Sequence, residues 1–193
     1  MKKLFGVVIA VIIIGFALIS SYNGLVQAEE KIDSVWANVE SQYQHRADLI
    51  PNLVNTVKGQ ANFEQETLTN VIKARSQATQ TKIDPTNMTE EQLTQFQQSQ
   101  NNIGSALSRL LVTVEKYPEL KAHDGFMNLQ AQLEGVENRI NVARNKFNEA
   151  AREYNQKVRQ FPAKFAAIIF GFKEKPYFKS ASGAENAPVV NFN

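Results

Sequence analysis

The hydrophobic positions of this chain follow two different patterns, one continuous and one periodic. Sixteen consecutive residues, 4–19, are apolar or small, and the whole stretch 4–28 carries no charge. About 20 apolar residues are needed to cross a hydrocarbon core of roughly 30 Å, so the segment up to Tyr22 is close to the length of one transmembrane helix. No comparable run follows. The pattern predicts a single membrane anchor and a remainder that folds in water.

The same segment has an alternative interpretation as a cleaved signal peptide. Lys2 and Lys3 precede it, and Val26-Gln27-Ala28 fits the small-residue pattern of a cleavage site. The apolar run is longer than the usual signal core of about 7–15 residues, and Tyr22 suits a position at the membrane interface. We therefore favour a retained anchor. The lysines predict an inner (cytoplasmic) membrane protein with a cytoplasmic N-terminus and a periplasmic or extracellular bulk.

Beyond the anchor, the apolar residues recur every three or four positions, which is typical of amphipathic helices. The first such helix can continue the anchor and carries Ile32, Trp36, Val39 and Tyr43. Pro51 disfavours helical geometry at Ile50, which predicts that a second helix begins there. A third helix should open at Thr89, because Gln92 three residues later completes a capping-box pattern.

The fourth helix has the clearest pattern, a heptad repeat like that of coiled coils. Apolar residues fall every seven positions at Phe126, Leu133, Ile140, Phe147, Tyr154 and Phe161. We therefore expect an all-α fold, an N-terminal transmembrane helix followed by an elongated antiparallel four-helix bundle. The expected divisions are a cytoplasmic stub and anchor at 1–28, the bundle at 29–161, an apolar, lysine-flanked membrane-proximal segment at 162–178 and a flexible tail at 179–193.

Composition removes several classes of function. The chain has 21 basic and 19 acidic residues, and Lys2 and Lys3 account for the difference, so the bundle has no excess of positive charge for a nucleic-acid partner. It has no cysteine, which removes disulfides and thiol chemistry. His45 and His123 lie in no metal-ligand spacing, and no phosphate-binding or nucleophile motif occurs in the sequence. We expect no enzyme, with no catalytic, cofactor-binding or metal-binding residues and no cofactor.

One polar pattern is unusual for a regular helix. Five asparagines form a stripe beside the heptad seam: Asn138, Asn141, Asn145, Asn148 and Asn155. Asparagine is a poor helix former, so such a stripe is costly if it is merely exposed. We interpret it as a candidate interaction stripe. Hydrogen bonds to neighbouring helices of the same subunit are the favoured interpretation, and a contact between subunits or plain solvent exposure are the alternatives.

The apolar segment 163–172 is the second candidate surface. In an antiparallel bundle the fourth helix returns to the end nearest the membrane, so this segment should lie there. Apolar residues flanked by lysines suit a membrane interface, where rings lie at headgroup level. The candidate membrane-surface contacts are Phe165, Ile168, Ile169, Phe170 and Phe172. The alternative is that this segment folds back and closes the end of the bundle.

Several ordered motifs resemble the LemA family. They are Tyr22-Asn23-Gly24-Leu25-Val26, Arg46-Ala47-Asp48-Leu49-Ile50-Pro51-Asn52-Leu53-Val54, Tyr117-Pro118-Glu119-Leu120, Glu137-Asn138-Arg139-Ile140 and Phe170-Gly171-Phe172. The likeness covers nearly the whole chain except its first residues and its tail. It implies an N-terminal transmembrane helix, an elongated helical bundle and no enzymatic activity. One departure is Phe63, where family members often have histidine.

These observations predict a non-enzymatic, membrane-anchored helical scaffold of the bacterial envelope that self-associates. The alternative, from another class, is an accessory or sensing subunit of a membrane enzyme or transporter. The expected partners are membrane lipid, further copies of the chain and an envelope protein, with no nucleic acid. A large homomeric particle after detergent extraction would support the scaffold. Stoichiometric co-purification with another membrane protein, or a thermal shift with a small molecule, would support the alternative.

Overall fold

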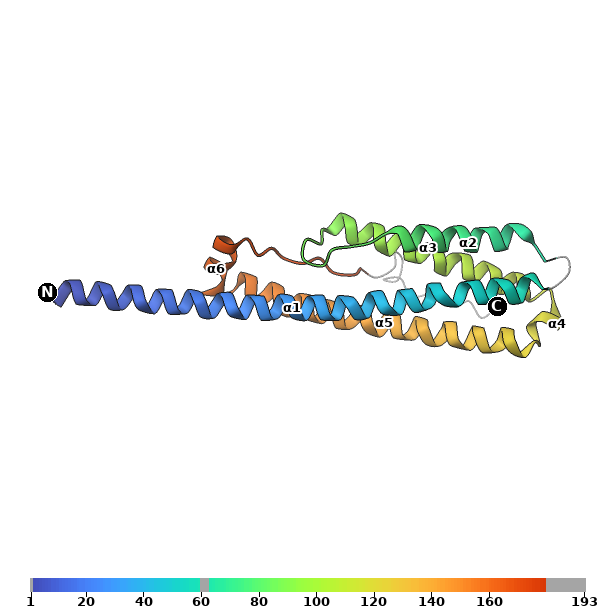
Figure 1. The fold of residues 1–193 in the computed structure, drawn as a ribbon, viewed down its shortest axis with the longest axis horizontal. Helices are drawn as coiled ribbons and strands as arrows, with labels where there is room; N and C mark the ends of the chain where they lie inside the picture. Colours follow the sequence, from blue (N-terminus) through green and yellow to red (C-terminus); the bar gives the residue numbers. More distant parts are fainter. Residues whose placement is uncertain (1, 60–62, 180–193) are drawn as a thin grey trace, which may run out of the picture.

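The computed structural model describes residues 2–59 and 63–179, and the regular structure in these ranges is helical throughout. The helices are α1 (Lys2–Lys58), α2 (Gln65–Gln80), α3 (Glu90–Val114), α4 (Pro118–Lys121), α5 (Asp124–Arg159) and α6 (Ala163–Phe170). The molecule is an elongated rod, and the N-terminal part of α1 projects alone from one end (Figure 1). The predicted fold, an anchor helix followed by an antiparallel bundle, is confirmed. The tail predicted at 179–193 lies outside the described residues, apart from Lys179.

Two helix pairs make up the bundle. α1 and α5 run antiparallel along most of the rod, and α2 and α3 form a shorter hairpin beside them (Figure 1). The heptad seam of α5 faces this interior, and five of its six predicted positions are buried: Phe126, Leu133, Ile140, Phe147 and Tyr154. Burying a side chain of this size contributes about 1.5–3 kcal/mol, so the seam supplies much of the driving force for folding.

α1 continues through Pro51, so the prediction of a new helix at that residue is wrong. A proline in a helix has no N–H to donate to the carbonyl four residues earlier, which here belongs to Ala47. Arg75 of α2 donates its Nε–H to the Ala47 carbonyl at 2.7 Å. Buried Ile50 and Leu53 hold the helix against the core on either side of the exposed proline. A tertiary hydrogen bond therefore replaces the helical one.

The ends of two later helices test local expectations. The capping box of α3 is present, because Thr89 accepts from the Gln92 N–H at 3.2 Å and Gln92 accepts from the Thr89 N–H at 3.0 Å. The N-cap of α5 is His123, whose Nδ1 accepts a hydrogen bond from the Gly125 N–H. Phe161, the last heptad position, lies beyond the end of α5 and is 69% exposed. The core seam therefore ends one heptad earlier than the spacing predicts.

The predicted segment 162–178 contains two different elements. Gly171 ends α6 with a φ of 79°, a left-handed conformation that favours glycine. Residues 172–179, which we call the strap, then run without helical structure back along the bundle (Figure 1). Phe178 near its end is 5% exposed and stacks on Trp36, with ring centroids 6.1 Å apart. The strap therefore contributes to the core of the bundle.

Candidate functional site

Two asparagines of α5 hold the strap through paired hydrogen bonds. Asn155 donates to the Lys175 carbonyl at 2.8 Å and accepts from the Lys175 N–H at 2.8 Å. Asn148 repeats this arrangement with Phe178, at 3.0 Å and 2.8 Å. Each amide thus supplies the N–H and C=O partners that a neighbouring strand would otherwise provide. A hydrogen bond of this kind contributes about 0.5–1.5 kcal/mol net, and an unpaired buried backbone group costs more.

The end of the strap is shared between the two helix pairs. Gln97 of α3 donates to the Lys179 carbonyl at 2.7 Å, and Arg144 of α5 donates to the same carbonyl at 2.9 Å. The Lys179 ammonium forms an ion pair with Glu90 at the start of α3. The strap therefore bridges α5 and α3, although it is the last part of the chain that the structure describes.

The asparagine stripe divides into two parts. Asn155 is buried and Asn148 is half-buried, and both bond within the subunit, but to the strap and not to a neighbouring helix. Asn138, Asn141 and Asn145, which we call the outer asparagines, are exposed. An interaction role for the outer asparagines stays a prediction. The strap itself was missed in the sequence, and the seven-residue spacing of Asn148 and Asn155 is the signal that a polar partner lies along α5.

A buried ammonium group fixes the start of the strap. Lys175 is 5% exposed, and its Nζ donates to Glu29 Oε1 at 3.0 Å, the Pro85 carbonyl at 3.1 Å and the Thr86 carbonyl at 2.6 Å. It also lies 5.6 Å from the centroid of the Tyr154 ring. A buried charge is tolerated only when it is paired and fully hydrogen-bonded, and three acceptors match its three N–H groups. Lys175 thus joins the strap to α1 and to the loop before α3.

Two titratable groups near Lys175 have raised pKa values. Burial raises the pKa of Asp33 above its ordinary value, the Glu29 carboxylate raises it further, and Lys175 opposes both effects. Among the described residues, Asp33 Oδ1 is buried and has no hydrogen-bond partner, which agrees with that direction. Burial also raises the pKa of Tyr154, so this phenol stays neutral at physiological pH.

Arg46 forms a second buried polar centre further along the bundle. The residue is 3% exposed, and its guanidinium donates to Glu137 at 2.9 Å and to the carbonyl and side-chain oxygens of Gln100 at 2.9 Å and 2.8 Å. The same group lies over the Tyr43 ring at 5.2 Å. These contacts join α1, α3 and α5, so the arrangement fixes the register of three helices.

α6 has one buried face and one exposed face. Ala166 and Ala167 pack against the bundle, where α6 contacts both α1 and α5. The opposite face consists of large apolar side chains that are 55–70% exposed: Phe165, Ile168, Ile169 and Phe170. Phe172, the fifth predicted membrane contact, is half-buried, with its ring 5.8 Å from that of Tyr22. α6 thus closes the end of the bundle while leaving an apolar surface uncovered.

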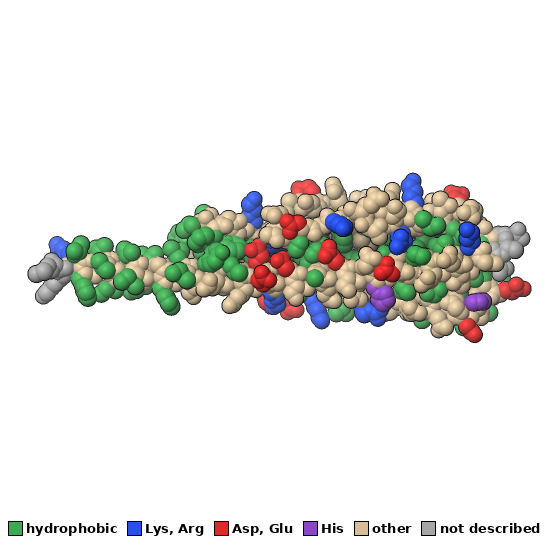
Figure 2. All heavy atoms as spheres, in the orientation of Figure 1, with side chains coloured by type: hydrophobic (Ala, Val, Ile, Leu, Met, Phe, Trp, Pro, Cys, Tyr) green, Lys and Arg blue, Asp and Glu red, His purple; other side chains and the backbone are tan. Residues whose placement is uncertain are grey.

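The exposed face of α6 adjoins the projecting part of α1. Within the described residues, α1 is the one helix long and apolar enough to cross a membrane, with a window of mean hydropathy 2.8 in which no residue is buried. Tyr22 lies just after this stretch, and its ring is 4.7 Å from that of Phe170. Figure 2 shows hydrophobic side chains along the projecting helix and gathered at its junction with the bundle, followed by charged groups. The two surfaces form one apolar region.

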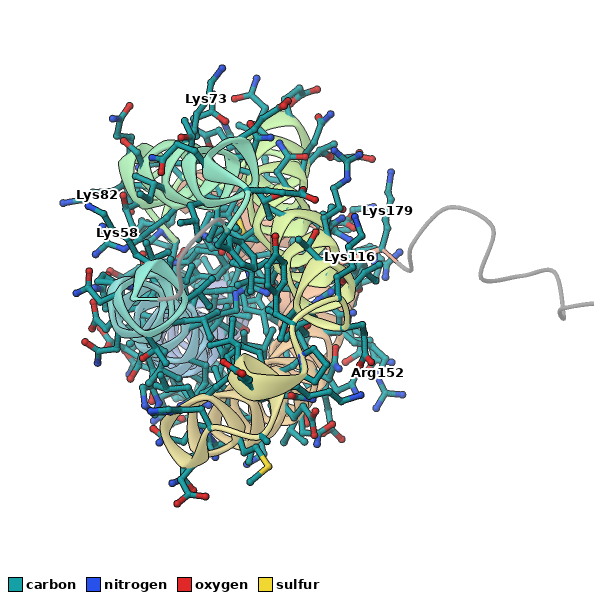
Figure 3. All side chains as sticks on the ribbon, turned by 90° about the vertical axis from the view of Figure 1, so that its right-hand side faces the viewer. Lys58, Lys73, Lys82, Lys116, Arg152 and Lys179 are labelled. Atoms are coloured by element: carbon teal, nitrogen blue, oxygen red, sulfur yellow. The ribbon has the colours of Figure 1, made fainter. Side chains whose placement is uncertain are left out.

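The labelled basic groups of the bundle do not converge. Figure 3 looks along the rod from the end opposite the anchor, and these side chains belong to different levels of the rod and lie around its perimeter: Lys58, Lys73, Lys82, Lys116, Arg152 and Lys179. Over residues 2–59 and 63–179, no group of three or more His, Asp or Glu side chains is placed to hold a metal ion. The described geometry therefore presents contact surfaces and buried polar clusters.

Comparison with known proteins identifies related sequences. The sequence model of the LemA family matches residues 35–192. The magnetosome proteins MamQ 1 and MamQ 2 of Paramagnetospirillum magneticum are each 26% identical over 200 residues, which cover 95% of this chain and 73% of those proteins. Protein LemA of Metamycoplasma hominis is 23% identical over 142 residues, covering 72% of this chain and 61% of that protein.

Proposed function

Since the chain belongs to the LemA family and is a membrane-associated helical protein, we propose that it is a non-enzymatic, membrane-anchored scaffold of the bacterial envelope that self-associates. The observation that carries this proposal is the continuity of α1, which joins the exposed apolar stretch to the bundle core in one helix. A single helix transmits its orientation to the bundle, so the rod stands at a defined angle on the membrane.

Packing at the base of the bundle supports a retained anchor. Leu25 and Ala28 are buried against the rest of the molecule, and Leu18 packs partly against the same core. Cleavage after Ala28 would remove Leu25 from a site where it is 1% exposed and would open the end of the core. Intact mass of the membrane-extracted protein should therefore include the anchor. A mass that begins at Glu29 would contradict this part of the proposal.

The lysine distribution supports the proposed orientation. Lys2 and Lys3 precede the apolar stretch, which favours a cytoplasmic N-terminus in the inner membrane and a bulk outside the cytoplasm. Lys164 and Lys173 flank the exposed face of α6, where their long stems can reach the headgroup region while the rings lie below it. On this proposal α6 rests on the outer surface of the same membrane.

Self-association has its best support on the outward face of α5. The outer asparagines surround Val142, which is 54% exposed, so an apolar centre has hydrogen-bonding groups around it. Interfaces combine such a centre with a polar rim. We therefore assign the contact between copies to this face.

Light scattering during size-exclusion chromatography of the detergent-extracted full-length protein tests the scaffold. We expect a homomeric particle of several copies. Asn141→Asp with Asn145→Asp should make it smaller without changing the unfolding temperature, because both residues are exposed. Asn101→Asp, an exposed asparagine on α3, is the matched control and should leave the particle intact. A monomer in the unaltered protein would contradict self-association.

The accessory or sensing subunit keeps one specific observation in its favour. A cavity of about 760 Å³ opens at the end of the bundle that carries α6. Ligand sites in proteins commonly fall between about 300 and 1,000 Å³. Stoichiometric recovery of a second membrane protein with the full-length chain would support this role over the scaffold.

A further inference from the structure

The cavity beside α6 has two chemically different walls. It lies between α1, the start of α3 and the residues that join α6 to the strap. One wall is aromatic and consists of Tyr22, Phe170 and Phe172, which we call the aromatic wall. The remaining lining, which we call the facing wall, is polar and includes the charged residues Glu29, Glu90, Lys173, Glu174 and Lys175. A ligand for this site needs an apolar or cationic part and a charged part close together.

The aromatic wall remains accessible to a ligand. The Tyr22 ring lies 4.7 Å from Phe170 and 5.8 Å from Phe172, so the three rings form one continuous surface. Tyr22 is 38% and Phe170 is 55% exposed, which leaves ring area open. The faces of aromatic rings attract ammonium groups, quaternary ammonium ions included. This wall can therefore receive a cationic amine as well as the first carbons of an apolar chain.

Carboxylates dominate the facing wall, but most of them already have a cationic partner. Glu29 accepts from Lys175 at 3.0 Å through Oε1, and Glu90 is paired with Lys179. Glu174 lies 3.8 Å from Arg159, a distance at which its carboxylate stays largely open to another cation. An anionic headgroup without an amine would meet the open carboxylate of Glu174 here.

One cation of the lining is available for a phosphate. Lys173 is exposed, and within the described part of the chain its ammonium makes no hydrogen bond or ion pair. It is adjacent in sequence to Phe172 of the aromatic wall and to Glu174. A group that carries both a phosphate and an ammonium therefore finds a partner for each charge within a short distance.

The position of the cavity along the rod favours a lipid as the source of that group. The exposed apolar stretch of α1 ends just before Tyr22, and the exposed face of α6 lies at the same level. Tyrosine and lysine at the end of a membrane-spanning helix mark the headgroup region. The aromatic wall therefore faces the layer in which headgroups are most concentrated.

We propose that this cavity binds the headgroup of a zwitterionic bilayer lipid, with its phosphate at Lys173 and its ammonium between the aromatic wall and Glu174. This inference rests on the proposed placement of α6 at the membrane surface. It makes the base of the rod a site that distinguishes lipids by headgroup, whereas the anchor alone responds to hydrocarbon.

Native mass spectrometry of the detergent-purified full-length protein tests the site. The probes are phosphatidylethanolamine and phosphatidylglycerol with identical acyl chains, added separately and in competition. We expect the unaltered protein to retain phosphatidylethanolamine about fivefold to tenfold more strongly, the range that one ammonium–aromatic contact can supply. Soluble phosphoethanolamine, which lacks acyl chains, should compete poorly.

Two variants and two matched controls locate the effect. Tyr22→Leu removes an aromatic face and keeps the apolar volume, and Lys173→Gln removes the phosphate partner. Both residues are exposed, so both variants should fold. Tyr22→Leu should lose the preference for phosphatidylethanolamine, whereas Lys173→Gln should retain both lipids more weakly, because both carry a phosphate. Phe165→Leu and Lys164→Gln make the same chemical changes on α6 outside the cavity and should keep both the preference and the retention.

Several outcomes would overturn the assignment. They are equal retention of the two lipids by the unaltered protein, an unchanged preference in Tyr22→Leu, unchanged retention in Lys173→Gln, or an equal loss in the matched controls. Competition by soluble phosphoethanolamine at the same concentration as the lipid would show a site for a free metabolite. The same spectra report the number of copies. A monomer that still prefers phosphatidylethanolamine would contradict only the scaffold, and an oligomer without the preference would contradict only the lipid site.

Discussion

α6 and the strap are consecutive in sequence, yet they differ in what they expose. α6 presents Phe165, Ile168 and Ile169 outward, whereas the strap buries Lys175 and Phe178. A helix satisfies most of its own backbone groups, so its side chains are free to meet water, lipid or protein. The strap has no internal backbone bonds and takes them from side chains of the bundle. Backbone pairing, more than hydrophobicity, decides which segment belongs to the core.

The difference assigns separate roles to the two segments. The strap should contribute to the free energy of unfolding, because its removal would open the core and leave polar groups of α5 unpaired. The exposed face of α6 should contribute little to folding and should instead affect contact with the membrane. The same residue type substituted in each segment should therefore give different results.

Truncating one phenylalanine in each segment should give the largest contrast. Phe178→Ala should lower the free energy of unfolding by about 3–5 kcal/mol, the usual cost of emptying a buried phenylalanine site. Phe165→Ala on α6 should change it by only about 0.5 kcal/mol, as expected for an exposed position. Denaturant titration of the full-length protein in detergent, followed by circular dichroism, measures both. Equal effects would mean that the strap is a peripheral segment.

A smaller contrast is expected between two asparagines of α5. Asn155→Asp places a carboxylate against the Lys175 carbonyl, removes a buried donor and should cost about 2–3 kcal/mol. Asn145→Asp, an exposed member of the same stripe, should stay within about 0.5 kcal/mol of the unaltered protein. Hydrogen exchange at the Lys175 and Phe178 amides should also become faster in the first variant alone. Unchanged exchange there would show that the amide pairs do not hold the strap.

The pH dependence of stability should show the smallest effect. Burial raises the pKa of Asp33 in the folded protein above its ordinary value of 3.8. At pH values between 3.8 and this raised pKa, the folded state therefore binds more protons than the unfolded state. The contribution of Asp33 to the free energy of unfolding should fall as the pH rises through this range. Asp33→Asn should lack this decline and gain stability relative to the unaltered protein toward neutral pH. Melting temperatures from pH 4 to 7 measure the difference, and a difference that does not change with pH would contradict it.

The elements that the sequence predicts well are those set by local spacing. The heptad positions of α5 and the capping box of α3 depend on residues within one helix, and the structure shows both. The helix start predicted at Pro51 is wrong because the hydrogen bond that compensates for the proline comes from Arg75, which is distant in sequence. Local rules describe the isolated helix and cannot include that partner.

The strap was missed for the same physical reason. Its backbone groups are paired with Asn148, 30 residues before Phe178, and with Asn155, 20 residues before Lys175. No periodicity within the segment therefore marks it. The stripe of asparagines indicated that amides on α5 were used, but the pattern could not name their partner. Of the five candidate membrane contacts, Phe172 is the one that lies half-buried, because it follows Gly171 and so belongs to the strap.

A fluorophore at Ile169 measures the contact of α6 with the membrane most directly. The chain has no cysteine, so Ile169→Cys and the control Ile72→Cys on α2 can each be labelled at a single site. Ile72 is similarly exposed but lies on the hairpin away from the anchor. In reconstituted liposomes, the label at Ile169 should be quenched by a lipid-attached quencher and shielded from aqueous iodide, with the reverse at Ile72. Equal quenching of both labels by iodide would show that α6 does not contact the membrane.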